Sequence, residues 1–389
     1  MMKNRWVKWA AGLLAGSLLI APLPHQEAQA AAPKPLSLSI NGSSVENGEL
    51  EVRAGHTYMP ISRLSELLGF LVEYDRDSKI LTLVRPDATV RMKLGNETAE
   101  INGQRMKSTA AFSENNQVFV PLRTLSTALK SKAGWDSARG SATLEDPERY
   151  RMDTSGGRTA WVSFTSGEVY SLESGVPKKL AQADVSELEW GTVDVRGLGG
   201  NAYVLTVERQ YGASMQAVQN RFQYLVKDGI VKKQAHFRYS GMYLPTELGP
   251  QRLPAQRAYL TDGQTVEVVG AGGSPAAEYN LAELTKQTGP FIVESVTADY
   301  LLVRAFDTLQ PTIANLRTGE AARLDQKLLD AAEAKEWSEV SSDVGDPLLL
   351  SSRLRFDRQD GEQLIFTYKR IAPGSVFGQE ATVSYKLSK

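Results

Sequence analysis

Apolar and polar positions divide the chain into three stretches with different patterns. The first is a short continuous apolar run, Trp9 to Pro24, which follows three basic residues in the first eight positions. The run is too short to span a bilayer comfortably, and Ala28-Gln29-Ala30 is a small-x-small site, as in secretory signal peptides. We therefore predict that residues 1–30 are a signal peptide cleaved after Ala30, with no transmembrane segment in the mature chain. An anchor that stays uncleaved is the alternative.

The second stretch contains an internal repeat. A shift of 61 residues without gaps aligns four separate patches, which indicates a duplication with copies at residues 38–83 and 99–144. The aligned patches are Tyr58-Met-Pro-Ile-Ser-Arg-Leu-Ser on Phe119-Val-Pro-Leu-Arg-Thr-Leu-Ser, Ile40-Asn-Gly on Ile101-Asn-Gly, Tyr74-Asp on Trp135-Asp, and Leu81-Thr-Leu on Ala142-Thr-Leu.

Each copy predicts the same small set of elements. Asn-Gly after the first apolar run predicts a hairpin turn, because these residues tolerate positive φ angles. Pro60 and Pro121 are expected at the first position of a short helix, and Gly69 is expected to end the first of these helices. An apolar stripe on the helix, then a strand, a polar turn and a second strand complete the unit. The sequence therefore predicts an α+β N-terminal module of two repeated strand-helix-hairpin units, each with a small sheet covered by one helix.

The paired segments resemble a known family, the copper amine oxidase N-terminal-like domain, also called the stalk domain. The resemblance covers about Leu36 to Glu145 and is carried by Ile-Asn-Gly, an apolar-Pro-Leu-Arg-x-Leu helix and aromatic-Asp. Ser62 and Tyr74 depart from this pattern, whereas Arg123 and Trp135 keep it. The resemblance implies an extracellular accessory module, over residues 31–149, without catalysis of its own. Arg123 and Trp135 are candidate polymer-binding residues, and the alternative is that both tie the helix to the sheet.

The family name raises the question of copper. Copper amine oxidase chemistry needs a tyrosine-derived quinone and several histidines around the metal, because imidazole is a usual ligand of Cu(II). The chain has no Cys, and only His56 and His236 remain after cleavage of the predicted signal peptide. Two distant histidines do not make a three-imidazole site. We therefore expect no oxidase activity, no metal site and no cofactor.

The third stretch, residues 150–389, consists of apolar and aromatic runs separated by turn residues. We expect an all-β domain here, because five β-branched or aromatic runs alternate with Gly or Asp-Gly turns. The turns recur about every 50 residues, near the length of a four-stranded blade, which predicts an irregular β-propeller of about five blades. An irregular β-sandwich or an open β-rich sheet is the alternative. Leu324 to Trp337 is the one expected helical interruption. The turn glycines are Gly167, Gly229, Gly263, Gly319 and Gly361.

Few residues of this third stretch suggest catalysis. It lacks a Gly-x-Ser-x-Gly elbow, and Ser341 to Gly345 resembles only the start of an Asp box, which is a folding turn. Two pairs of carboxylates are the remaining catalytic candidates, as acid and base in glycoside cleavage. Solvated surface acids are the alternative reading of both pairs. The pairs are Glu187 with Glu189, near Trp190, and Asp343 with Asp346.

Composition narrows the class of protein. With 44 basic and 45 acidic residues the net charge is −1, which gives no basic excess for binding nucleic acid. An exported chain without Cys depends on packed cores rather than disulfides, which suits a bacterial envelope. We therefore predict a non-enzymatic secreted or cell-surface protein, extracellular or associated with the cell wall. It would combine a stalk-like module for surface attachment or spacing with a propeller-like binding module.

The partners that fit this prediction are a cell-wall polymer or another envelope protein. An extracellular glycan-active enzyme on a propeller scaffold is the main alternative, and a purely structural scaffold is another.

Overall fold

The computed structural model describes residues 37–45, 50–136, 140–183, 190–211, 218–240, 253, 255–306, 308–339 and 353–387. From Leu36 onward the chain forms one compact unit. The predicted signal peptide, both carboxylate pairs and the segment that resembles an Asp box lie outside the described residues. Within the described ranges, no helix is both long enough and apolar enough to cross a membrane.

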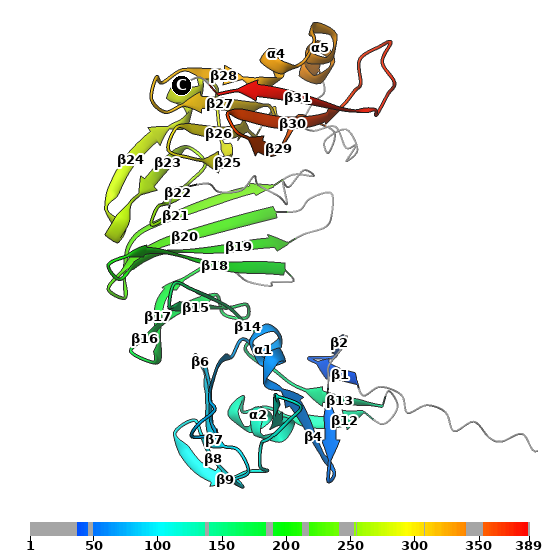
Figure 1. The fold of residues 1–389 in the computed structure, drawn as a ribbon, viewed down its shortest axis with the longest axis vertical. Coiled ribbons are helices and arrows are strands. Elements are labelled where there is room, and N and C mark those ends of the chain that lie inside the picture. Colours follow the sequence, from blue (N-terminus) through cyan, green and yellow to red (C-terminus); the bar gives the residue numbers. More distant parts are fainter. Residues whose placement is uncertain are drawn as a thin grey trace, which may run out of the picture. The chain divides into compact units, whose positions relative to one another are not determined.

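The duplicated part contains three sheets, and each combines strands from both copies (Figure 1). Their strand orders are β12-β13-β1-β2, β10-β11-β4-β3 and β5-β6-β7-β8-β9. The expectation that each copy has its own sheet is therefore corrected. The first copy consists of β1 Ser37–Ile40, β2 Ser43–Val45, β3 Glu51–Arg53, β4 His56–Pro60, η1 Ile61–Arg63, α1 Leu64–Leu68, β5 Leu71–Asp75 and β6 Ile80–Arg85. After β7 Ala88–Lys93, the second consists of β8 Thr98–Ile101, β9 Gln104–Lys107, β10 Phe112–Glu114, β11 Gln117–Pro121, α2 Leu122–Ala128, β12 Ala133–Asp136 and β13 Ser141–Leu144.

The two copies are related by a pseudo-two-fold axis at the centre of the β4–β11 ladder. Met59 pairs with Val120, which is its own equivalent in the second copy. On either side of this pair, Pro60 pairs with Phe119 and Tyr58 with Pro121, so the antiparallel ladder maps onto itself when the copies are exchanged. The outer sheets correspond in the same way, except that β7 lies between β6 and β8 while β13 pairs directly with β1 in parallel. The strands are too short to cover the core within one copy, so the copies share it.

The predicted turns and helix ends are found with one shift in position. Asn41-Gly42 and Asn102-Gly103 all have positive φ angles, which confirms the two hairpin turns. Gly69 ends α1 in the left-handed region, with φ 67°, as predicted. Pro60 and Pro121, however, are the last residues of their strands and the N-cap residues of the helices, one position before the expected place. Because their backbones are extended, the two prolines pair within the β4–β11 ladder and also stand directly before the helices.

The β-rich part consists of five consecutive antiparallel sheets, each with its strands in sequence order. A mostly β architecture of many small sheets is thus confirmed for the described residues. The sheets are β14 Tyr150–Ser155, β15 Arg158–Ser163, β16 Glu168–Glu173 and β17 Val176–Gln182; then β18 Trp190–Gly199, β19 Ala202–Tyr211, β20 Val218–Lys227 and β21 Ile230–Ser240; then β22 Ala258–Thr261, β23 Thr265–Val269 and β24 Pro275–Asn280; then β25 Phe291–Val296, β26 Tyr300–Ala305, β27 Pro311–Asn315 and β28 Ala321–Arg323; and then β29 Arg355–Asp360, β30 Gln363–Lys369 and β31 Glu380–Lys386.

Successive sheets share their apolar cores. One cluster of buried side chains joins the first two sheets, and separate clusters join the second to the third, the third to the fourth and the fourth to the fifth. The side chains of β26 illustrate the arrangement, because Leu301 and Val303 belong to the cluster with the third sheet while Leu302 belongs to the cluster with the fifth. Side chains alternate between the faces of a strand, so each inner sheet packs against a neighbour on both faces.

Turns and helices in this part agree with the sequence in most places. Each of the five sheets contains one of the five predicted turn glycines, at a hairpin between consecutive strands. The single helix expected at Leu324 to Trp337 is instead two short helices, α4 Leu324–Leu328 and α5 Ala331–Glu339. The sequence prediction missed the short helix α3 Leu281–Thr285 and a 3-10 turn, η2 Ala271–Gly273. Asn280 caps α3 by accepting a hydrogen bond from the Glu283 N–H.

Candidate binding groove

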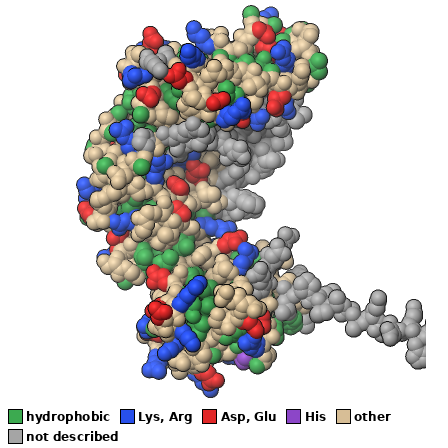
Figure 2. Space-filling model, in the orientation of Figure 1, with side chains coloured by type: hydrophobic (Ala, Val, Ile, Leu, Met, Phe, Trp, Pro, Cys, Tyr) green, Lys and Arg blue, Asp and Glu red, His purple; other side chains and the backbone are tan. Residues whose placement is uncertain are grey.

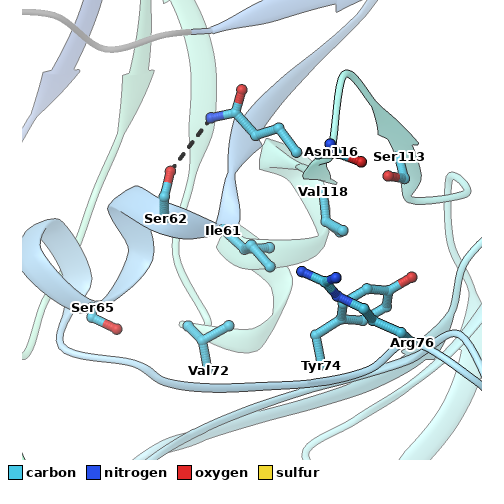
Figure 3. Close-up of a pocket in the computed structure, with 10 residues that line it drawn as sticks. Ile61, Ser62, Ser65, Val72, Tyr74, Arg76, Ser113, Asn116 and Val118 are labelled. Carbon is cyan, nitrogen blue, oxygen red and sulfur yellow. Dashed lines mark hydrogen bonds between the residues drawn. The ribbon is translucent and has the colours of Figure 1, made fainter.

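A groove of about 650 Å³ lies in the duplicated module (Figure 3). Its walls come from both copies: η1, α1 and β5 belong to the first copy, and the β10–β11 hairpin belongs to the second. The groove therefore exists only because the pseudo-two-fold packing brings the hairpin of one copy to the helix of the other. The lining residues are Ile61, Ser62, Ser65, Val72, Tyr74, Arg76, Ser113, Asn116, Gln117 and Val118.

The floor of the groove is one face of β5. Val72 and Tyr74 are two residues apart on β5, so their side chains project to the same side of the sheet. Val72 and Tyr74 are half-buried, whereas Arg76 is exposed in the turn that follows the strand. β5 is an edge strand of its sheet.

The opposite wall is polar. Gln117 Nε2 donates a hydrogen bond of 3.4 Å to Ser62 Oγ, which links the β10–β11 hairpin to the start of η1 (Figure 3). Asn115 and Asn116 form the hairpin turn with φ angles of 49° and 62°. Because Asn adopts the left-handed region more readily than most residues, the turn places an amide at the rim of the groove.

The turn that carries Arg76 is held by Asp75. Asp75 Oδ2 accepts a hydrogen bond of 2.7 Å from Ser78 Oγ, and Oδ1 accepts bonds from the backbone N–H groups of Asp77 and Ser78. The hydrogen bonds from Ser78, and then that from Asp77, lower the pKa of the Asp75 carboxyl. The carboxylate thus fixes the turn from outside the groove, while Arg76 is the only ionisable group among its ten lining residues apart from the Tyr74 phenol.

Arg123 and Trp135, the binding residues predicted from the sequence, lie at the equivalent positions of the second copy. Arg123 is the second residue of α2 and is exposed, and Trp135 on β12 is 50% exposed. Their equivalents in the first copy are Ser62 and Tyr74, which both line the groove. The sequence points to the second-copy pair, which keeps the family pattern, and not to the first-copy groove. The signal for the groove was in the repeat alignment, because Arg123 and Trp135 align with Ser62 and Tyr74.

A second pocket, of about 430 Å³, lies beside the start of α2. Arg123 and His56 both line it, together with Lys107 and Glu97. His56 begins β4 of the first copy, so this pocket too combines a helix of one copy with the hairpin of the other.

The residues present do not fit a copper site. His56 lies on β4, whereas His236 lies on β21, where its ring stacks on Phe222 with centroids 4.3 Å apart. In the part of the chain that the structure describes, no group of three or more His, Asp or Glu side chains is arranged to hold a metal ion.

The fold thus consists of a duplicated module, which contains the groove, followed by a β-rich part. Residues 39–144 match the family model described as the copper amine oxidase N-terminal domain, and a second match to it covers residues 105–174. The resemblance deduced from the sequence is thus confirmed for the duplicated part. The second match continues past residue 149, where the predicted domain boundary falls directly before β14.

Comparisons with other proteins show distant similarities. No curated protein matches the chain. Among solved structures, the dihydro-heme d1 dehydrogenase NirN in complex with DHE matches at 11% identity and a TM-score of 0.19, over 66% of each chain. The Pan2 WD40 domain of Neurospora crassa matches at 10% identity and a TM-score of 0.16, over 64% of this chain and 76% of that one. The chain thus spans 66% of the NirN chain.

Proposed function

We propose that this is an exported, non-enzymatic protein of the bacterial envelope that attaches to a cell-wall polymer through its duplicated module. The observation that carries the proposal is the groove between the two copies, lined by an aromatic ring, a guanidinium, two amides and three hydroxyls. A ring that stacks and groups that donate and accept hydrogen bonds are the means by which proteins bind sugars and other polar polymers. These groups bind and orient a ligand without forming or breaking bonds.

The β-rich part serves, in this proposal, as an irregular five-bladed propeller that presents a binding face to another envelope component. Two observations support it: the five sheets are consecutive antiparallel meanders, and each neighbouring pair shares an apolar core. Blades of a propeller pack in this way. The side chains on the face seen in Figure 2 mix basic and acidic groups, which suits a soluble binding surface.

The attachment is tested by sedimentation with purified bacterial cell walls. We expect the purified protein to co-sediment, and Tyr74→Ala to lower the bound fraction about five- to tenfold, since stacking of a ring contributes on the order of 1 kcal/mol or more. Phe377→Ala is the matched control, because it removes an aromatic ring that is 75% exposed and lies outside the groove. Circular dichroism verifies that each variant is folded. Absence of co-sedimentation, or full binding by Tyr74→Ala, would refute the proposal.

The propeller is tested by amine-specific cross-linking and mass spectrometry. In a ring of five blades the fifth sheet neighbours the first, so cross-links are expected between Lys178 or Lys179 on β17 and Lys386 on β31, all of which are exposed. An open array gives cross-links between consecutive sheets only.

A further inference from the structure

The duplication gives two residues of the groove equivalents that line the second pocket. Exchange of the copies maps the β4–β11 ladder onto itself about Met59 and Val120, so the same exchange maps the helix-and-hairpin arrangement of one groove onto the other. The positions of Ser62 and Gln117 in the first groove correspond to Arg123 and His56 in the second. Arg123 and His56 do line one pocket, so the helix start and the hairpin meet in both copies.

The two sets of residues differ in sequence but share their chemistry. Each set includes one aromatic ring on the strand after the helix: Tyr74 lines the first groove, and its equivalent Trp135 is 50% exposed on β12, outside the residues that line the pocket at Arg123. Each also contains one exposed arginine, at a different position: Arg76 in the turn after β5, and Arg123 on α2. A ring and a guanidinium are thus present in both copies, although the positions of the arginines differ.

Both surfaces carry positive charge. The first groove contains an arginine and no carboxylate among its lining residues. The pocket at Arg123 contains Lys107 as a second cation, with Glu97 as its one carboxylate. The module therefore presents two local basic sites on a chain whose net charge is −1. A guanidinium pairs with a carboxylate or phosphate in a fixed geometry, so these sites favour an anionic ligand.

We propose that the two surfaces bind successive segments of one linear acidic glycan, with the sugar rings on Tyr74 and Trp135 and the acid groups on Arg76 and Arg123. This inference rests on the proposed function and specifies its ligand. A polymer with a repeating acidic sugar satisfies both sites at once, and the second contact is then intramolecular, which raises the affinity without any new kind of contact. Aromatic faces favour a ring, so a uronic acid polymer binds more tightly than poly(glycerol phosphate), which offers the charge without the ring.

The test compares three polymers by isothermal titration calorimetry with the purified protein: a polyuronate, poly(glycerol phosphate) and neutral dextran. We expect the polyuronate to bind most tightly and dextran most weakly. The polyuronate is further expected to bind at least tenfold more tightly than its own trisaccharide, because only the polymer reaches both sites. Arg76→Gln and Arg123→Gln are each expected to remove most of this advantage of length, that is, of the difference in affinity between the polymer and the trisaccharide. Arg91→Gln, an exposed arginine on β7 away from both sites, is expected to keep it.

The outcomes separate the two proposals. Equal binding of dextran and polyuronate, or an advantage of length that survives both Arg76→Gln and Arg123→Gln, would overturn the acidic, two-site inference and leave attachment to the wall in place. Binding of poly(glycerol phosphate) in preference to polyuronate would overturn the sugar-ring contact. Failure to bind cell walls at all would overturn the proposed function together with this inference.

Discussion

Arg85 and Asp146 each lie two residues after the end of a repeat, 61 residues apart, and form a buried bidentate ion pair. Arg85 Nη1 and Nη2 donate to the two Asp146 carboxylate oxygens over 3.1 and 2.8 Å, and the two residues are 0% and 3% exposed. Arg53 and Glu114, also 61 residues apart, form a second ion pair between equivalent positions. Residues at equivalent positions meet where a two-fold axis passes, so these pairs join the copies directly.

The buried pair is expected to be a major source of stability. Arg85→Met leaves the Asp146 carboxylate buried without its partner, and also removes hydrogen bonds to the carbonyl oxygens of Leu68 and Glu148. We expect the free energy of unfolding, measured in urea, to fall by about 3–5 kcal/mol. Arg91→Met, at an exposed site, should change it by less than about 0.5 kcal/mol. The double variant Arg85→Met/Asp146→Leu should recover part of the loss; a strictly additive loss would mean that the two charges do not interact.

Gly69 is expected to tolerate no side chain. Its φ is 67°, and an added Cβ would lie 2.7 Å from the carbonyl oxygen of Tyr150. Gly69→Ala therefore adds a steric clash to the cost of a left-handed backbone, and we expect a loss of about 2–4 kcal/mol. Gly95→Ala is the control, because Gly95 has φ 81° and open space around it, so it bears the backbone cost alone. Equal losses in the two variants, measured by urea unfolding, would argue against the close approach.

Trp161 is expected to be needed for its N–H as well as its size. The side chain is fully buried, and Nε1 donates a hydrogen bond of 2.8 Å to the carbonyl oxygen of Gly69. Trp161→Phe leaves this carbonyl without its partner and creates a small cavity, so we expect a loss of about 2–4 kcal/mol in thermal or urea unfolding. Trp135→Phe, at a half-exposed position, should cost less than about 0.5 kcal/mol. Comparable effects of the two changes would contradict this assignment.

Alkaline pH is expected to destabilise the β-rich part. Burial raises the pKa of Tyr224 to about 12, and burial together with Glu168 raises that of Tyr170 to about 12. A tyrosine whose pKa is higher in the folded than in the unfolded chain stabilises the fold below about pH 10, and this contribution is lost as the pH rises towards 12.

Tyr224 alone is expected to account for about 2 kcal/mol of this loss. The measurement is the free energy of unfolding at pH 9 and pH 11.5, with Tyr224→Phe expected to show the smaller decrease. If the tyrosinate absorbance titrates fully near pH 10 while the chain stays folded, the tyrosine pKa values are not raised and the prediction is wrong.

Local features of the fold were accessible from the sequence. The Asn-Gly turns, the glycine that ends α1 and the five turn glycines follow from steric limits on single residues, which neighbours in space change little. The helix expected at Leu324 to Trp337 is divided because Leu329, between α4 and α5, has an extended backbone with ψ 149°. The helix α3 has only five residues, too few for an apolar period to stand out.

By itself, the sequence determined the duplication, the resemblance of the duplicated part to the copper amine oxidase N-terminal domain and the β-rich character of the remainder, because repeats, turns and apolar periods are properties of consecutive residues. Only the tertiary structure decided which strands pair, and with this where the groove lies. β4 pairs with β11 across 61 residues, and strands of three to six residues carry too little pattern to specify a partner so far away. Tyr74 and Gln117 line one groove because the two copies bury their short sheets against each other.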